Sequence, residues 1–200
     1  MHRIDNIIGN YFNKHETKNF LYKFIVNRYK NKFKEILRTL SFDSIMEIGS
    51  GEGYIILYTL QVKKPKLIVA SDISMRYFHS TLDCYRLVCK GENIPFPNHM
   101  FDLVVACEVL EHIYTPVEVV REMTRISKNW VLITVPYEPY WRLLNIMRGK
   151  YINNLGNTPG HVSHFTKNSI LKLLSGYLTP VKIMIVFPWI FILGQVKVKS

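Results

Sequence analysis

A glutamate and three glycines in the segment IMEIGSGEGY, residues 45–54, are the first residues of this chain whose spacing could serve chemistry. The glycines are Gly49, Gly51 and Gly53. Glycine lets the main chain approach a ligand that any Cβ would exclude. The spacing is not G-x-G-x-x-G, because Tyr54 stands where a dinucleotide-binding turn has its third glycine, and Glu47 would repel a pyrophosphate. The turn therefore makes room for a different cofactor.

A second acid, Asp72, ends the next apolar run in the segment IVASDIS. A carboxylate at the end of a strand can accept two hydrogen bonds from the vicinal hydroxyls of a ribose. The alternative is that Asp72 caps a helix that begins near Ser74. The strand before it favours the ribose.

The run from Glu47 to Gly53 resembles the first motif of class I S-adenosylmethionine-dependent methyltransferases, E/D-x-G-x-G-x-G, and the resemblance extends over about residues 42–176. It implies that the glycine turn accommodates the methionine end of the cofactor, that Glu47 helps to hold its ammonium group, and that Asp72 binds its ribose. It implies further cofactor contacts at Ser50, Ile73, Gly91, Glu92, Cys107 and Glu108. One position departs: Lys90 stands where many relatives have an aspartate that bonds the adenine amino group.

The segment EVLEH places Glu108, Glu111 and His112 at i, i+3 and i+4, so a helix there would put them on one face. His112 could act as an acid or base, because an imidazole titrates near neutral pH. Alternatively, the three side chains could hold Mg²⁺, Mn²⁺ or Zn²⁺ together with His161 or His164, which are weaker catalytic candidates themselves. The segment is similar to ubiquinone-pathway O-methyltransferases and to enzymes that methylate small-RNA 3′ ends. Small-molecule relatives without a metal also carry it, so a metal is not favoured.

Aromatic residues gather in the long connection 136–166, and connections of this length usually carry function. Tyr137, Tyr140 and Trp141 could stack on a substrate ring. The alternative is a hydrophobic cap. The connection is expected to recognise the substrate.

Positioning these residues requires a sheet, and apolar runs from Ser44 onward alternate with stretches of helical pattern. Such strands predict a parallel sheet covered on both faces, hence a doubly wound, Rossmann-like α/β fold. The last two runs, VKIMIVF and FILGQVKV, are too close for a helical crossover and predict an antiparallel C-terminal pair. The expected helices are 52–61, 74–82, 115–127 and 167–176.

An amphipathic helix with a basic face is expected over residues 18–40, before the first strand. Its lysines and arginines could be a solvated flank, or a lid or docking surface for an anionic substrate. The chain has 200 residues and a net charge of +11, which would attract phosphates and makes a nucleic-acid partner conceivable. Three cysteines without CxxC pairing favour a reducing, cytoplasmic setting, and neither a signal peptide nor a membrane span is predicted.

The sequence thus predicts one methyltransferase domain that methylates a small molecule, such as a lipid, quinone or glycan precursor. Its expected parts are an N-terminal helical cap (1–41), a cofactor-binding core (42–135), a substrate loop (136–166) and a C-terminal helix with the strand pair (167–200). Alternatives are an RNA 2′-O-methyltransferase with the Glu/Glu/His metal site, or an inactive partner subunit with this fold. A nicotinamide-dependent dehydrogenase is disfavoured by Tyr54.

Overall fold

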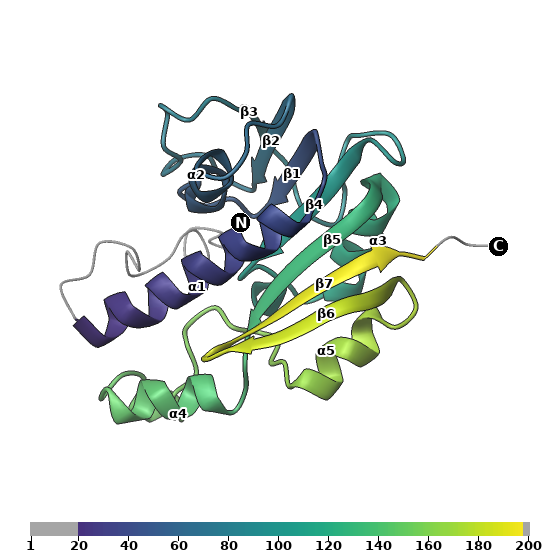
Figure 1. The fold of residues 1–200 in the computed structure, drawn as a ribbon. Helices are drawn as coiled ribbons and strands as arrows, with labels where there is room; N and C mark the ends of the chain where they lie inside the picture. The colour runs from purple at the N-terminus through teal and green to yellow at the C-terminus, as the bar shows by residue number, and fades with distance from the viewer. Residues whose placement is uncertain (1–19, 198–200) are drawn as a thin grey trace, which may run out of the picture.

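A seven-stranded sheet with the order β3-β2-β1-β4-β5-β7-β6 forms the centre of the computed structural model, which describes residues 20–197 (Figure 1). Neighbours among the first five strands are parallel, whereas β7 runs antiparallel to both β5 and β6. The doubly wound fold with an antiparallel C-terminal pair is therefore confirmed. The strands are β1 (Ser44–Ile48), β2 (Leu67–Asp72), β3 (Tyr85–Val88), β4 (Phe101–Cys107), β5 (Ser127–Pro136), β6 (Leu178–Val186) and β7 (Trp189–Val196).

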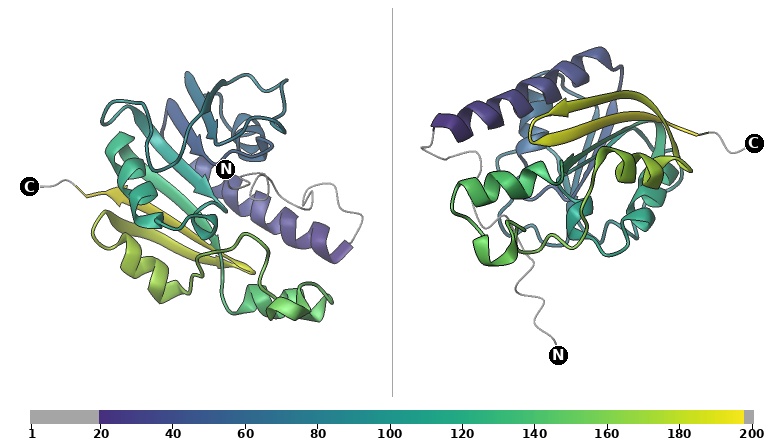
Figure 2. Two further views of the ribbon diagram at one scale, coloured as in Figure 1. Left: turned by 180° about the vertical axis from the view of Figure 1, so that it is seen from behind. Right: turned by 90° about the horizontal axis from the view of Figure 1, so that it is seen from below.

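Helices cover both faces of the sheet, and each face has its own apolar cluster. Helices α1 and α2 pack on one face, and α3 and α5 on the other (Figure 2). Helix α4 lies in the connection after β5, where the sequence analysis expected a substrate loop and no helix. The helices are α1 (Phe20–Thr39), α2 (Tyr54–Leu60), α3 (Pro116–Ile126), α4 (Tyr140–Met147), α5 (Lys167–Leu174) and the 3-10 helices η2 (Leu110–His112) and η3 (Ile152–Asn154).

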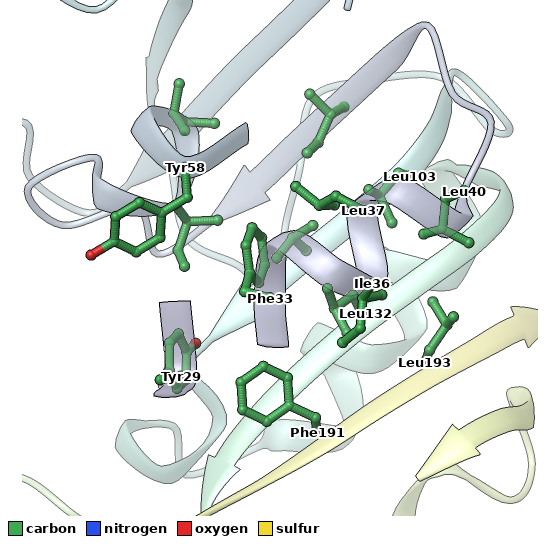
Figure 3. Close-up of a cluster of buried hydrophobic side chains, with 14 of the residues drawn as sticks. Tyr29, Phe33, Ile36, Leu37, Leu40, Tyr58, Leu103, Leu132, Phe191 and Leu193 are labelled. Carbon is green, nitrogen blue, oxygen red and sulfur yellow. The ribbon is translucent and has the colours of Figure 1, made fainter. Parts of the chain in front are cut away.

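Helix α1 is the expected amphipathic N-terminal helix, and its apolar side is part of the core. Phe33, Ile36 and Leu37 are almost fully buried and belong to the cluster that contains Leu103 of β4 and Leu132 of β5 (Figure 3). Burying each such side chain contributes about 1.5–3 kcal/mol, which is enough to fix the helix across the sheet. Residues 18 and 19, also expected to be helical, lie outside the described range.

The predicted helix over 74–82 is wrong, because these residues form turns. Asp72 Oδ1 accepts a hydrogen bond from the Ser74 N–H at 3.1 Å, and Ser74 Oγ accepts one from the Arg76 N–H at 3.4 Å. Such local side-chain bonds offer the backbone an alternative to the helix. The segment still contributes the buried Phe78 to the core.

Within residues 20–197, no helix is both long enough and apolar enough to cross a membrane. The expectation that the chain begins without a signal peptide concerns residues outside this range.

Candidate functional site

A pocket opens at the carboxyl ends of β1 and β4, on the face that α1 and α2 cover. In open α/β sheets this edge is where ligands bind. The glycine turn, both strand ends, α1, α2 and the first residue of β7 contribute to its wall. The described residues that line it are Val26, Tyr29, Glu47, Gly49, Ser50, Gly51, Glu52, Tyr54, Ile55, Cys107, Glu108 and Trp189.

The glycine turn between β1 and α2 needs its glycines for two separate reasons. Gly49 and Gly51 have φ angles of 68° and 52°, which side chains other than glycine rarely adopt. A Cβ on Gly49 would collide with the side chain of Val109, whereas a Cβ on Gly51 would meet no atom within 4 Å. Gly49 therefore permits close packing against the residues after β4, and Gly51 presents bare main chain to open space.

Glu47 is a buried carboxylate in the pocket wall with an unmet acceptor. Its side chain is 1% exposed, and its Oε2 accepts no hydrogen bond from any described residue. Burial raises the pKa of Glu47 well above its ordinary value, and the nearby Asp72 carboxylate raises it further. An ammonium group at this place would supply the missing donor and the missing charge, so Glu47 fits the methionine end of S-adenosylmethionine.

Asp72 lies beside the glycine turn at the end of β2. Its Oδ2 accepts a hydrogen bond from the Gly51 N–H at 2.8 Å, and its Oδ1 accepts the bond from Ser74. No helix follows, so the helix-cap alternative is wrong. The carboxylate is half-buried and next to the turn, where it could also reach a ribose, and this role stays a prediction.

The other expected cofactor contacts surround this centre. Ser50, Cys107 and Glu108 line the pocket, and Gly53 precedes α2 with a φ of 88°. Ile73 is 48% exposed beyond Asp72. A Cβ on Gly91 would lie 3.1 Å from Ile48 Cγ2, so this glycine lets the turn after β3 pack closely on β1. Glu92 is half-buried beside it, whereas Lys90 is exposed.

The EVLEH segment does not form the expected α-helix, so its three polar residues do not share one helical face. Glu108 has a φ of 58°, which turns the main chain away from the direction of β4. Glu111 and His112 belong to the short η2 that follows. Glu108 consequently lines the cofactor pocket, whereas Glu111 and His112 do not. The left-handed backbone at a non-glycine residue is what separates them.

Glu111, His112 and His161 come together outside the described lining of the pocket. Each offers one ligand atom, and these atoms lie within 4.8 Å of one another. His112 Nδ1 lies 3.0 Å from the carbonyl oxygen of Gly160, and its ring packs edge-on against that of His161 at 4.9 Å. Glu108 and His164 of the expected metal set do not join this cluster.

His164 lies next to a buried acid that the sequence analysis did not single out. Its Nδ1 is 3.7 Å from Glu138 Oε1, just after β5, and burial raises the pKa of Glu138. The geometry gives His164 an ion-pair partner in Glu138 when the imidazole is protonated.

The aromatic residues expected to bind substrate lie next to the pocket wall, not in it. Tyr137 and Tyr140 pack on each other at 5.0 Å, and Trp141 is buried between His161 and Trp189. The aromatic rings that do line the pocket include Tyr29 and Trp189, which pack against each other at 4.9 Å. The sequence signals neither, because Tyr29 has the spacing of a core residue in a helix and Trp189 stands in a short turn between strands.

Comparisons with known proteins agree with this architecture. Residues 46–132 match the family described as "Methyltransferase domain". Among curated proteins, no sequence matches the chain.

Solved structures share the fold at low sequence identity. A Pyrococcus horikoshii protein is 12% identical with a TM-score of 0.72, covering 90% of this chain and 93% of that one. A structure of the Haloferax volcanii Trm112 methyltransferase activator in complex with a methyltransferase matches at 15% identity and a TM-score of 0.68. The match covers 89% of this chain and 93% of that one. Magnesium protoporphyrin IX methyltransferase from Synechocystis PCC 6803, with bound SAH, matches at 13% identity and a TM-score of 0.65. The match covers 90% of this chain and 89% of that one.

The family match spans the glycine turn, Asp72 and the end of β4, and the glycine turn and the end of β4 line the pocket around Glu47. The strand order, the antiparallel β7 and this pocket occur together in one chain. Residues 46–132 therefore form a methyltransferase domain, and the chain has the fold of solved S-adenosylmethionine-dependent methyltransferases.

Proposed function

We propose that this methyltransferase acts on a small-molecule acceptor, such as a lipid, quinone or glycan precursor. The observation that carries the proposal is the shape of the pocket: it runs from Glu47 and the glycine turn to Trp189, with Val26 and Tyr29 of α1 in its wall. A helix lying over the site favours a small acceptor over a polymer.

The cofactor is held by contacts of three kinds. Glu47 would accept from the ammonium group, the bare main chain at Gly51 would leave room for the methionine end, and Asp72 would accept from the ribose hydroxyls. The remaining contacts come from Ser50, Gly53, Ile73, Gly91, Glu92, Cys107 and Glu108. Bound S-adenosylmethionine supplies an activated methyl group. The pocket residues orient the acceptor toward that group and exclude water, and positioning alone can supply about 7–11 kcal/mol.

The charge of the pocket supports a small acceptor over RNA. Its described lining includes Glu47, Glu52 and Glu108 and no lysine, arginine or histidine, so an approaching phosphate would be repelled. The basic side of α1 is the observation that favours RNA: burial and then the charges of Lys30 and Arg38 lower the pKa of Lys34. A filter-binding measurement with a short RNA, at low and at physiological salt, tests this second candidate.

His112, His161 and His164 are the remaining catalytic candidates. Glu111, His112 and His161 do not line the pocket, so we infer that they join η2 to the connection after α4, with a divalent metal not favoured. His112 can act as an acid or base only on an acceptor that extends beyond the residues lining the pocket. His164, with Glu138 as its neighbour, is the weaker candidate.

Calorimetric titration with S-adenosylmethionine and S-adenosylhomocysteine tests the proposal, repeated with EDTA and then with Mg²⁺, Mn²⁺ or Zn²⁺. We expect micromolar binding that does not change with metal. Asp72→Ala should weaken it by about 1–3 kcal/mol, because a carboxylate bonded to hydroxyls is lost. Asp83→Ala, at an exposed position, is the matched control.

Binding that requires a metal would instead favour the cluster of Glu111, His112 and His161 as a metal site. A folded protein that binds neither compound would contradict the enzyme assignment and leave the partner-subunit alternative. Unchanged affinity in Asp72→Ala would show that the ribose lies elsewhere.

A further inference from the structure

Trp189 lines the pocket, and its indole N–H is a buried donor for which no described residue provides an acceptor. The side chain is 2% exposed, it lines the pocket, and its Nε1 makes no hydrogen bond within residues 20–197. Trp141, packed against it, shows the usual arrangement: its Nε1 donates to Thr158 Oγ1 at 2.9 Å. Buried polar groups are almost always paired, so a buried donor in a pocket wall indicates a ligand atom.

Trp189 is held firmly in place by its neighbours. It is the first residue of β7 and is paired with Pro136 at the end of β5. Its ring packs against Tyr29 at 4.9 Å and against Trp141 at 5.7 Å. A donor fixed on three sides can select for the position of an oxygen atom, because little side-chain entropy is lost on binding.

The strand order puts Trp189 at the acceptor's end of the pocket. β7 is separated from β1 by β4 and β5, and the glycine turn with Glu47 and Asp72 lies on the β1 and β2 side. Glu47 and the glycine turn therefore lie toward the β1 side of the pocket, and Trp189 lies toward the β7 side.

The chemistry of this end defines the class of acceptor. Aromatic rings favour a flat, apolar body. The described lining contains three glutamates and no lysine, arginine or histidine, which disfavours an anion. The indole N–H of Trp189 can donate to an oxygen atom of the acceptor, and the acidic lining favours an acceptor without negative charge.

Resting on the proposed function, we propose that Trp189 is a specificity-determining residue that donates a hydrogen bond to an oxygen of a neutral aromatic acceptor, of the phenol class. The oxygen takes the place of the missing protein acceptor, and the rings of Tyr29 and Trp189 hold the aromatic body. The same contact rejects a molecule of equal shape that lacks the oxygen, because the N–H then stays unpaired.

The test uses ¹⁵N-labelled protein saturated with S-adenosylhomocysteine and follows the indole N–H signals of the three tryptophans by NMR. The probes are p-cresol, toluene, which lacks the oxygen, and p-toluate, which is anionic. The Trp189 signal is assigned by its loss in Trp189→Phe, or by elimination with Trp130→Phe and Trp141→Phe if that variant does not fold. We expect p-cresol to shift the Trp189 signal, and toluene and p-toluate to bind at least about tenfold more weakly.

Trp189→Phe keeps an aromatic ring and removes the donor, so it should bind p-cresol about five- to tenfold more weakly with unchanged affinity for S-adenosylhomocysteine. Trp130→Phe, on β5 away from the pocket lining, is the matched control and should change neither. A Trp189 signal that p-cresol does not move, or tighter binding of toluene or p-toluate than of p-cresol, would overturn the inference. Equal loss of S-adenosylhomocysteine affinity would overturn it too, by assigning the N–H to the cofactor. If the wild type does not bind S-adenosylhomocysteine, the proposed function fails first, and the inference with it.

Discussion

Asp102 and Glu47 are carboxylates on the neighbouring parallel strands β4 and β1, near opposite ends of the sheet. Asp102 Oδ2 accepts hydrogen bonds from the Asp43 N–H, the Ser44 N–H and Ser44 Oγ at 2.8–2.9 Å, and Lys128 Nζ lies 3.1 Å from its Oδ1. Burial alone would raise the pKa of Asp102, but these donors lower it from 3.8 to about 2. Glu47, by contrast, has a raised pKa and an oxygen with no donor among the described residues.

The difference separates two uses of a buried polar group. At the amino end of the sheet, Asp102 ties the start of β4 to the start of β1 and uses its oxygens within the protein. At the carboxyl end, Glu47 and Trp189 line one pocket, and Glu47 Oε2 and Trp189 Nε1 lack partners among the described residues. The amino end should therefore respond to mutation in stability and the carboxyl end in ligand binding.

The largest effect is expected from Glu47→Gln. Removing the charge that pairs with the cofactor's ammonium group should weaken S-adenosylmethionine binding by about 3 kcal/mol, or roughly a hundredfold. The free energy of unfolding of the ligand-free protein should stay the same or rise, because a buried charge with an unmet oxygen is removed. Calorimetry and urea denaturation measure the two quantities. Glu118→Gln, on the partly exposed surface of α3, is the control. If Glu47→Gln lowers the free energy of unfolding without weakening cofactor binding, Glu47 serves stability as Asp102 does, and the contrast between the two ends of the sheet is wrong.

Asp102→Ala should give the opposite pattern. The N–H groups of Asp43 and Ser44 lose their acceptor, so the free energy of unfolding should fall by about 2–3 kcal/mol at neutral pH. Cofactor affinity measured by calorimetry should not change, because Asp102 does not line the pocket. A large drop in affinity at full stability would mean that the two ends are coupled through β1 and β4.

The same two ends differ in how far sequence reasoning could predict them. Glu47 and the glycine turn lie on one continuous segment, so their local spacing was enough to predict that they come together at the pocket. Tyr29 and Trp189 meet only because α1 and β7 pack together across β5, and no local pattern encodes that contact. The helix predicted for 74–82 fails for a different, local reason, since the hydrogen bonds of Asp72 and Ser74 compete with helical ones.

The two carboxylates should also give opposite dependences of stability on pH. The folded pKa of Asp102 lies below its ordinary value of 3.8, so its contribution is present above about pH 3.8 and is lost as the pH falls through 2. The shift corresponds to about 2 kcal/mol. The folded pKa of Glu47 lies above its ordinary value of 4.5, so its contribution is present below pH 4.5 and is lost as the pH rises.

Thermal unfolding of the ligand-free protein across this pH range, with Asp102→Asn and Glu47→Gln beside the wild type, measures both contributions. Asp102→Asn should reduce only the loss of stability at acid pH. Glu47→Gln should reduce only the loss of stability as the pH rises. The same curve for Glu47→Gln and the wild type would show that the pKa of Glu47 is not raised in the folded protein.

The smallest effect is expected from Tyr29→Phe, which sharpens the comparison because Tyr29 is a pocket residue whose polar group is satisfied. Its hydroxyl lies 2.8 Å from Thr134 Oγ1, and burial raises its pKa, so the proton stays on the oxygen. Losing this bond should reduce the free energy of unfolding by about 1 kcal/mol, with cofactor and p-cresol affinities unchanged because the ring remains. If instead stability is unchanged and p-cresol affinity falls, the Tyr29 hydroxyl binds the acceptor, and a satisfied bond in the ligand-free protein does not exclude a role at the site.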